Sequence, residues 1–262
     1  MADRIVIDRS DPACVVVTLN RPKKRNALTL ELWRELAATF ASLEDDEEAR
    51  VVILTGAGGY FCAGADISEF GEVRTGKEAG EIYEAAVEQC NVTIQSLSKP
   101  TIAAISGFCI GGGFALAQVC DFRVADSTAV FSLPPARLGI IYRRHECETL
   151  LALVGLAKAK EILFTAQRFD VEQAKAFGIV DRIADASTDV LAIAHEFARS
   201  ISGNAPLSVK GMKFILNALA AGSADDQQSE ISGLINTAID SEDYKNAVQA
   251  FADKRQPKFR GR

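Results

Sequence analysis

The chain has 262 residues, which suits one large domain or one and a half, because domains average roughly 100–200 residues. Apolar residues make up 48% and charged residues 24% of the chain, a typical globular composition that excludes a disordered, collagenous or coiled-coil protein. The net charge of −6 argues against nucleic acid as a partner, since nucleic-acid binding requires a basic surface.

The N-terminal part of the chain predicts strands that alternate with helices. Two short runs of alternating apolar residues, 5–8 and 14–19, indicate a hairpin of strands. Apolar residues then recur at helical spacing over residues 29–44, which predicts an amphipathic helix. The apolar run 51–55 predicts a buried strand, and the glycine-rich residues 56–59 predict a turn after it.

The middle of the chain continues the same alternation. A helix is expected over residues 82–97, and Pro100 prevents it from continuing. A strand is expected at 101–105, and two shorter strands at 122–125 and 129–132. Strands that alternate with helices predict a layered α/β core built from βαβ-type units.

The last third of the chain predicts helices almost throughout. Residues 206–221 and 229–251 are each expected to form a helix that is partly buried and partly exposed, with little sheet to pack against. We place a soft boundary between a core at residues 1–203 and a C-terminal helical region at residues 204–262.

The cysteines and the N-terminus indicate a cytoplasmic protein. Six cysteines are spread along the chain without a CxxC pair, which favours reduced core cysteines over disulfides or a zinc site. The N-terminus has no apolar run of signal-peptide length. Residues 101–120 are uncharged over about the length of a membrane span. Their glycines would break such a helix, so we expect a buried strand, a glycine turn and a buried helix, with no membrane as a partner.

The chain has only two histidines, His145 and His195. A multi-histidine metal site is therefore excluded, and we expect no metal. Neither histidine lies in a recognisable Ser-His-Asp motif, which disfavours that kind of hydrolase.

Two glycine-containing turns follow two of the apolar strands. The first is residues 61–67 (FCAGADI), and the second is residues 107–113 (GFCIGGG). Small residues let backbone N–H groups approach a ligand closely, and the second turn opens a helix at Phe114, whose N-terminus favours negative charge. Two such donors that converge on one oxygen would form an oxyanion hole, whereas either turn alone is better explained as a tight turn without a ligand.

These turns belong to a longer series of motifs. The series is NRPKKRNAL, VVILTGAGGYFCAGADI, TIAAISGFCIGGGFALAQVCDFRVA, FSLPPARLGI and the C-terminal DYKNAVQAFADKRQPKFRGR. In this order, and over essentially the whole chain, they resemble the enoyl-CoA hydratase/isomerase family, also called the crotonase family. The resemblance implies an α/β fold, a crotonase-like spiral of repeated ββα units with a C-terminal helical oligomerisation region. It also implies a homotrimer or a dimer of trimers.

The resemblance implies a chemistry as well. Members of the family bind acyl-CoA thioesters and stabilise an enolate at the thioester carbonyl with two backbone N–H groups. By motif position, these would be the amides of Ala65 and Gly112 in this chain. No cofactor is implied beyond the CoA moiety of the substrate.

The resemblance also implies where CoA binds. The family places the CoA adenine along the AGAD turn, which corresponds to Ala63, Ala65, Asp66 and Ile67. Basic residues usually meet the CoA phosphates, and Arg25 and Lys254 stand at matching positions. Each of these two is also explained as a solvated surface charge.

The chain departs from the family at both positions that carry the hydratase glutamates. One glutamate normally lies two residues after the third glycine of the GGG motif, where this chain has Ala115. The other normally follows the proline of an FxxPE segment, where this chain has Pro135. Neither alanine nor proline transfers protons, so the usual two-carboxylate addition of water has no evident machinery.

Tyr142 and Glu146 are the remaining candidates for catalysis, and each has two interpretations. A tyrosine in an LGxxY segment resembles methylmalonyl-CoA decarboxylase-like members, but Tyr142 is also explained as a packed aromatic side chain. Glu146 stands where the family usually has glycine, either as a relocated base for isomerisation or hydration or as a glutamate that favours a helix start. A non-catalytic acyl-CoA-binding homologue is the remaining alternative.

Overall fold

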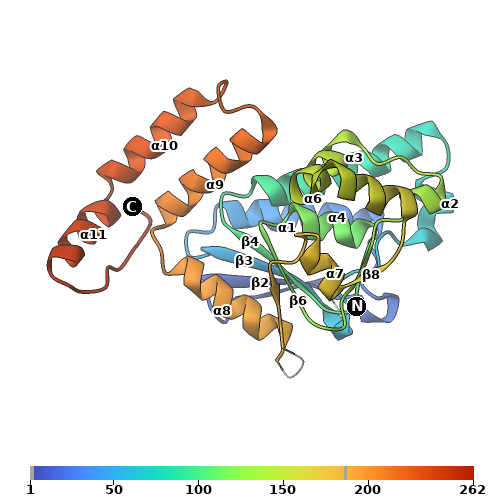
Figure 1. The fold of residues 1–262 in the computed structure, drawn as a ribbon, viewed down its shortest axis with the longest axis horizontal. Helices are drawn as coiled ribbons and strands as arrows, with labels where there is room; N and C mark the ends of the chain where they lie inside the picture. The colour runs from blue at the N-terminus through green and yellow to red at the C-terminus, as the bar shows by residue number, and fades with distance from the viewer. Residues whose placement is uncertain (1–2, 186–187) are drawn as a thin grey trace.

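The computed structural model describes residues 3–185 and 188–262, which form two β-sheets surrounded by helices (Figure 1). The larger sheet has six strands in the order β1-β2-β3-β4-β6-β9, and the smaller has three in the order β5-β7-β8. The strands of the larger sheet are β1 (Ile5–Asp8), β2 (Cys14–Leu19), β3 (Val51–Gly56), β4 (Thr101–Ile105), β6 (Phe122–Ala125) and β9 (Arg182–Ile183).

Pairing in the larger sheet follows from the buried apolar runs. β1 and β2 pair antiparallel, which confirms the predicted hairpin, and all the other neighbours pair parallel. Parallel neighbours require crossover connections, and helices α1 (Leu30–Glu44) and α3 (Lys77–Ser96) provide two of them. Strands covered on both faces are apolar throughout, as in the fully buried run Val51–Leu54 at the start of β3.

The smaller sheet explains the spiral. It consists of β5 (Phe108–Ile110), β7 (Val130–Ser132) and β8 (Phe169–Asp170). The chain twice adds a strand to the larger sheet, then a strand to the smaller one, and then a helix, as in β4, β5 and α4 (Gly112–Val119). This is the ββα repeat that the resemblance implied. Strands β5, β8 and β9 were not predicted, because two or three residues are too short to show an alternating pattern.

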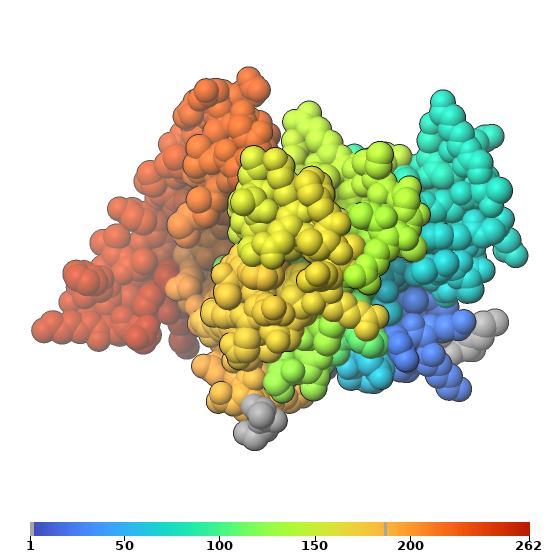
Figure 2. Space-filling model, turned by 45° about the vertical axis from the view of Figure 1, so that its right-hand side comes forward, coloured from blue at the N-terminus to red at the C-terminus, as the bar shows by residue number. Residues whose placement is uncertain are grey.

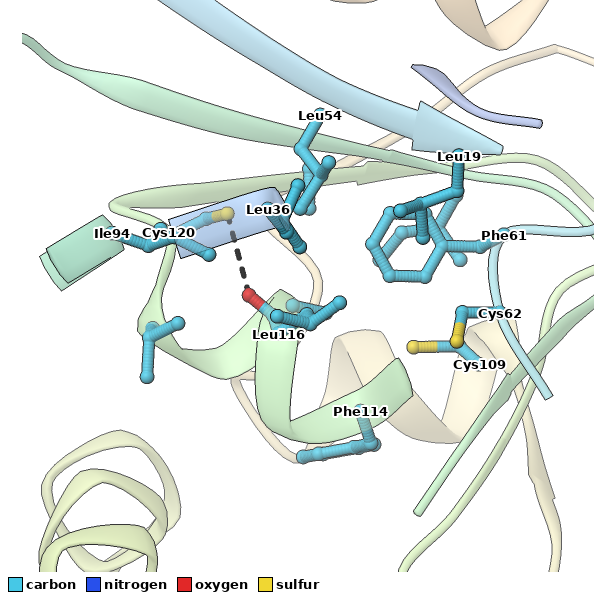
Figure 3. Packing of buried hydrophobic residues seen from close by; sticks show 14 of the residues in the cluster. Leu19, Leu36, Leu54, Phe61, Cys62, Ile94, Cys109, Phe114, Leu116 and Cys120 are labelled. Carbon is cyan, nitrogen blue, oxygen red and sulfur yellow. Dashed lines mark hydrogen bonds between the residues drawn. The ribbon is translucent and has the colours of Figure 1, made fainter. Parts of the chain in front are cut away.

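The larger sheet buries a different set of side chains on each face. Val52 and Leu54 belong to a large core that also includes Leu36 of α1 and Leu116 of α4 (Figure 3). Their neighbours Val51 and Ile53 face a second core, which α8 (Val190–Ser202) covers. Figure 1 shows α8 on one side of the strands, with α1, α3 and α4 on the other.

Helices α1 and α3 start close to the residues predicted from the sequence, and further helices complete the layers around the cores. Thr29 caps α1 by accepting a hydrogen bond from the amide of Leu32, 3.1 Å away, so the helix starts one residue after the predicted position. Helix α3 starts five residues before the predicted residue 82. The others are α2 (Phe70–Val73), α5 (Pro135–Leu138), α6 (Arg144–Thr165), which bends at Gly155, and α7 (Val171–Ala176).

The C-terminal helices are α9 (Pro206–Ala221), α10 (Gln228–Asp240) and α11 (Glu242–Ala252), and they project to one side of the sheets (Figures 1 and 2). The prediction of a single helix over residues 229–251 is wrong. Ser241 between α10 and α11 has an extended backbone, and its hydroxyl oxygen accepts a hydrogen bond from the amide of Tyr244, 3.0 Å away. A serine that caps a new helix therefore ends the previous one.

The uncharged segment 101–120 folds as β4, β5 and α4, joined at glycines, which confirms the predicted strand, turn and helix. Within the described residues, no helix has the length and apolar character needed to cross a membrane.

Candidate active site

The two glycine turns lie against each other. The amide of Cys62 donates to the carbonyl of Phe108 over 2.7 Å, and the amide of Ile110 donates to the carbonyl of Cys62 over 3.0 Å. Only glycine allows this approach at two positions. A Cβ atom on Gly64 would lie 2.6 Å from the oxygen of Ile110, and one on Gly113 would lie 2.3 Å from the oxygen of Cys62.

The approach of the turns brings together the two amides that were expected to form the oxyanion hole. A Cβ atom on Gly112 would lie 3.5 Å from the nitrogen of Ala65. The amides of the two residues next to Ala65 each have a partner within the protein. The Asp66 amide donates to the carbonyl of Leu28, and the Gly64 amide donates to the sulfur of Cys62. Gly112 is the first residue of α4, where an N–H has no acceptor within the helix. Within the described part of the chain, neither the Ala65 nor the Gly112 amide has a protein acceptor.

Both amides border one cavity of about 300 Å³. Most of its lining is apolar, with Trp33 of α1, Phe70 of α2 and Val87 of α3 among the residues that form it. Tyr142 and four charged side chains also line it. The charged residues are Arg74, Glu84, Arg137 and Glu146.

Glu146 combines a helix-capping contact with a place in this cavity. It is the third residue of α6, and its carboxylate accepts a hydrogen bond from the amide of Arg143 over 2.9 Å. The residue is only 9% exposed, and within the described residues its carboxylate has no ion pair. Burial raises the pKa of Glu146 above its usual range, and the nearby carboxylate of Glu84 raises it further. A buried carboxyl with a raised pKa is the kind of group that exchanges protons with a substrate.

Tyr142 lines the same cavity and is half-buried against the large core. Burial raises the pKa of its hydroxyl well above the ordinary value, and the carboxylates of Glu146 and Glu84 add to the effect. Tyr142 therefore remains protonated at neutral pH, so it can donate a hydrogen bond or a proton but does not act as a base.

The positions of the two missing glutamates hold no group that transfers protons. Pro135 is the first residue of α5 and lines the cavity. Ala115 is buried in α4. The acid or base of this cavity must therefore come from elsewhere in the chain.

Of the residues expected to meet CoA, Ala63 and Ile67 line the cavity. The side chain of Asp66 is occupied within the protein instead: its carboxylate accepts hydrogen bonds from the Ser68 hydroxyl at 2.5 Å and from Arg21 at 3.0 Å. Burial acts to raise the pKa of Asp66, but these hydrogen bonds outweigh it and lower the pKa. The geometry gives this side chain a structural role in holding the turn.

Arg25 and Lys254 lie in different places. Arg25 is exposed, with its guanidinium carbon 5.1 Å from the ring centre of Phe108, in the strand that borders the second glycine turn. Arg168, which the sequence did not single out, faces the same ring at 5.7 Å. Lys254 follows α11 and is exposed. Helix α11 lies at the end of the molecule opposite to α2, so Lys254 does not join the cavity of its own chain (Figure 1).

Arg74 and Glu84 also line the cavity, although neither residue stands out in the sequence. Arg74 lies in the segment GEVRTGK, which resembles a phosphate-binding loop only in spacing. Glu84 lies within the helix predicted over residues 82–97, where one glutamate among several gives no signal of its own. The structure joins them in an ion pair that faces the cavity.

Comparisons with known proteins agree with this geometry. The sequence pattern of the family described as enoyl-CoA hydratase/isomerase matches residues 9–262. The chain is 37% identical to a short-chain-enoyl-CoA hydratase from Clostridium acetobutylicum, over 96% of this chain and 95% of the relative. It is 31% identical to a peroxisomal Delta(3,5)-Delta(2,4)-dienoyl-CoA isomerase from Arabidopsis thaliana, over 97% of this chain and 95% of the relative.

A crystal structure of an enoyl-CoA hydratase/isomerase family protein from Hyphomonas neptunium superposes with a TM-score of 0.94 at 34% identity, and the match covers 100% of this chain and 99% of that one. The chain therefore belongs to the enoyl-CoA hydratase/isomerase family of acyl-CoA-processing enzymes, and its fold is the crotonase fold.

Proposed function

We propose that the protein is an enoyl-CoA isomerase, in which Glu146 moves a proton along the acyl chain while the amides of Ala65 and Gly112 hold the thioester oxygen. The observation that carries this proposal is the position of Glu146, a buried carboxyl that has no ion pair among the described residues, in the same cavity as the two amides. Backbone donors without protein acceptors stabilise the negative charge that develops on a thioester oxygen.

The proposed reaction needs only one carboxyl. Ionised Glu146 takes a proton from carbon 2 of a 3-enoyl thioester, and the electron pair moves onto the thioester oxygen as a dienolate. The protonated carboxyl then returns the proton to carbon 4, which leaves a 2-enoyl thioester and regenerates the ionised base. A pKa raised toward neutrality suits a group that must both take up and release a proton.

Hydration is less well supported, because it uses two carboxylates in this family. Ala115 and Pro135 occupy the two usual positions. The second carboxylate of the cavity, Glu84, is already paired with Arg74. Glu146 is therefore the cavity carboxyl that has no ion pair within the described residues, and a single such group favours isomerisation.

The test is mass spectrometry and absorbance of the purified protein with crotonyl, 3-enoyl, malonyl and methylmalonyl thioesters. We expect conversion of the 3-enoyl to the 2-enoyl thioester. Glu146→Gln should lower kcat by about 100-fold to 10,000-fold with little change in KM, the usual contribution of one acid–base group. Gain of water by crotonyl-CoA, or full activity of the Gln variant, would contradict the assignment.

Decarboxylation is the second candidate, and Tyr142 favours it. A protonated hydroxyl in the same cavity as the two amides can reprotonate an enolate formed by loss of carbon dioxide. In that case, malonyl-CoA or methylmalonyl-CoA should release carbon dioxide, and Tyr142→Phe should slow the release. If no thioester changes although binding is confirmed, the remaining candidate is a non-catalytic acyl-CoA-binding protein.

The proposed CoA site follows the first glycine turn, with Ala63 and Ile67 beside the acyl cavity. Arg25 and Arg168 each lie near the ring of Phe108, next to this turn, and would supply two cations for the CoA phosphates. No cofactor beyond the CoA moiety is needed for a proton shift.

We also propose that the chain forms a homotrimer or a dimer of trimers. Helices α9–α11 carry large apolar side chains that are more than half exposed, including Leu216 at 64% and Phe251 at 88%. Burying such a surface against further copies of the chain is favourable. Lys254, away from its own cavity, would then be available to a CoA bound by a neighbouring copy.

A further inference from the structure

An ion pair lies in the wall of a cavity whose lining is mostly apolar. Arg74 follows the last residue of α2, and Glu84 lies in α3, one residue after Tyr83. The two side chains are 19% and 22% exposed, and both line the cavity that contains the Ala65 and Gly112 amides. The pair therefore lies within reach of the acyl group that this cavity receives.

Aromatic rings hold the pair in position. The guanidinium carbon of Arg74 lies 5.0 Å from the ring centre of Phe70 and 5.2 Å from that of Tyr83. The hydroxyl of Tyr83 in turn accepts a hydrogen bond from the indole nitrogen of Trp33 over 3.1 Å. Because its neighbours fix it, Arg74 needs little rearrangement to bind a ligand.

The pair keeps hydrogen-bonding capacity that the protein does not use. A guanidinium has five N–H donors, and within the described residues the Arg74 side chain has one hydrogen bond, to Glu84. The Glu84 carboxylate likewise accepts only this bond in the described part of the chain. Donors and acceptors therefore stand side by side in the wall of the cavity.

Three kinds of acyl group would meet this pair differently. A plain alkyl chain would remove water from both charges without replacing its hydrogen bonds, which is unfavourable. A carboxylate would gain Arg74 but would face the carboxylates of Glu84 and Glu146, while Arg137, the other cation of the lining, is exposed to solvent. A neutral hydroxyl both donates and accepts, so it can bond to Glu84 and Arg74 together.

We propose that the Arg74–Glu84 pair makes the cavity selective for acyl-CoA thioesters whose acyl group carries a neutral hydrogen-bonding substituent, such as a hydroxyl, beyond the reacting carbons. This selectivity rests on the proposed function in that the same cavity holds the acyl group. It concerns binding, however, and does not depend on the proton transfer by Glu146.

The experiment measures by calorimetry the binding of saturated thioesters, which have no double bond to isomerise, and each ligand is purified immediately before use because 4- and 5-hydroxyacyl thioesters cyclise to lactones with release of CoA. The ligands are hexanoyl-CoA, its 4-, 5- and 6-hydroxy derivatives and adipyl-CoA, which have the same chain length. We expect at least one hydroxyhexanoyl-CoA to bind the native protein about 10-fold or more tightly than hexanoyl-CoA, as hydrogen bonds to charged groups predict. Equal affinities for all the hydroxy derivatives and hexanoyl-CoA, or tightest binding of adipyl-CoA, would overturn the proposal.

Variants test whether the Arg74–Glu84 pair causes the preference for a hydroxylated acyl group. Arg74→Met combined with Glu84→Met removes both charges together, and we expect it to lose the hydroxyl preference and to bind hexanoyl-CoA more tightly. The matched control is Lys77→Met with Glu81→Met, an exposed ion pair on the same helix α3, which should keep the preference. A preference that persists in the Arg74/Glu84 variant contradicts the proposal. Unchanged affinity for free CoA shows that each variant is folded.

The ratio of the affinities for hydroxyhexanoyl-CoA and hexanoyl-CoA does not depend on turnover. Glu146→Gln should keep the preference for the hydroxylated thioester even though the proposed isomerase activity is lost. If the native protein isomerises no thioester but shows the binding preference, the proposed reaction fails and the selectivity stands.

Discussion

At the scale of single residues, the environment of Glu146 determines what its carboxyl can do. A glutamate at the third position of a helix usually caps the helix start, and Glu146 does so through the amide of Arg143. Most such glutamates face solvent, whereas this one is buried beside a cavity and near a second carboxylate. The capping contact fixes the carboxyl in place, and burial makes it a base that holds its proton more tightly.

The raised pKa of Glu146 predicts a pH-dependent change in stability. The folded protein binds this proton more tightly than the unfolded chain, whose carboxyl titrates near 4.5. The contribution of Glu146 to the free energy of unfolding is therefore greatest below that pH, and it falls as the pH rises through the folded-state pKa. Glutamine keeps the hydrogen-bond acceptor but does not titrate. Glu146→Gln should therefore gain stability relative to the native protein as pH increases.

The measurement is denaturant unfolding of both proteins between pH 4 and pH 8. The difference between their free energies of unfolding should change steadily in favour of the variant. A difference that stays constant over this range would mean that the Glu146 pKa is not raised. Glu148→Gln, an exposed position of the same helix, serves as the control for the substitution itself.

At the scale of elements, the site depends on the loop between β2 and α1 being tied to the turn after β3. Asn26 makes this connection. Its side-chain amide donates to the carbonyls of Ala57 and Tyr60, at 2.9 and 2.6 Å, and its side-chain oxygen accepts from the amide of Arg21 at 2.9 Å. Asn26 is fully buried and adopts a left-handed backbone with φ 58°, which asparagine tolerates better than most residues.

We expect Asn26→Ala to lower the free energy of unfolding by about 2–4 kcal/mol, because it leaves three partly buried backbone groups without their side-chain partner. Asn91 provides a matched comparison. It is equally buried, and its side-chain nitrogen and oxygen have no partner within the described residues. Asn91→Ala should therefore cost less in a thermal or denaturant unfolding experiment. Equal losses would show that burial, and not hydrogen bonding, explains the effect at Asn26.

At the scale of the whole molecule, the projecting helices α9–α11 are the least self-sufficient part of the fold (Figure 2). Polar contacts tie them to the sheets, including Lys213 to Asp121 at 2.6 Å and Arg50 to the carbonyl of Phe259 at 2.5 Å. Their apolar side chains nevertheless remain exposed in the single chain. This combination favours assembly with further copies.

Sedimentation or light scattering should give a mass of at least three times the 28.1 kDa of one chain. Leu216→Glu in α9 should reduce that mass toward a single chain, because a charge in a buried apolar interface is unfavourable. Arg34→Glu, which places the same charge on the exposed side of α1, should leave the mass unchanged. A native protein that sediments as a single chain would contradict the proposed assembly.

The sequence by itself determined the elements whose signals are local. Strands β1–β4 and helix α1 follow from apolar patterns over four or more consecutive residues. The two glycine turns follow from small residues at fixed spacing, and the resemblance to the family implied that the amides of Ala65 and Gly112 would form the oxyanion hole.

Only the tertiary structure decided which side chains share the cavity. Arg74 follows α2, and Glu84 and Glu146 lie in α3 and α6, so the three residues lie in separate elements that the spiral brings to one pocket. The strands β5, β8 and β9 also depend on contacts between segments. Charge and burial act through space, so the roles of these residues follow from the neighbours that the fold supplies.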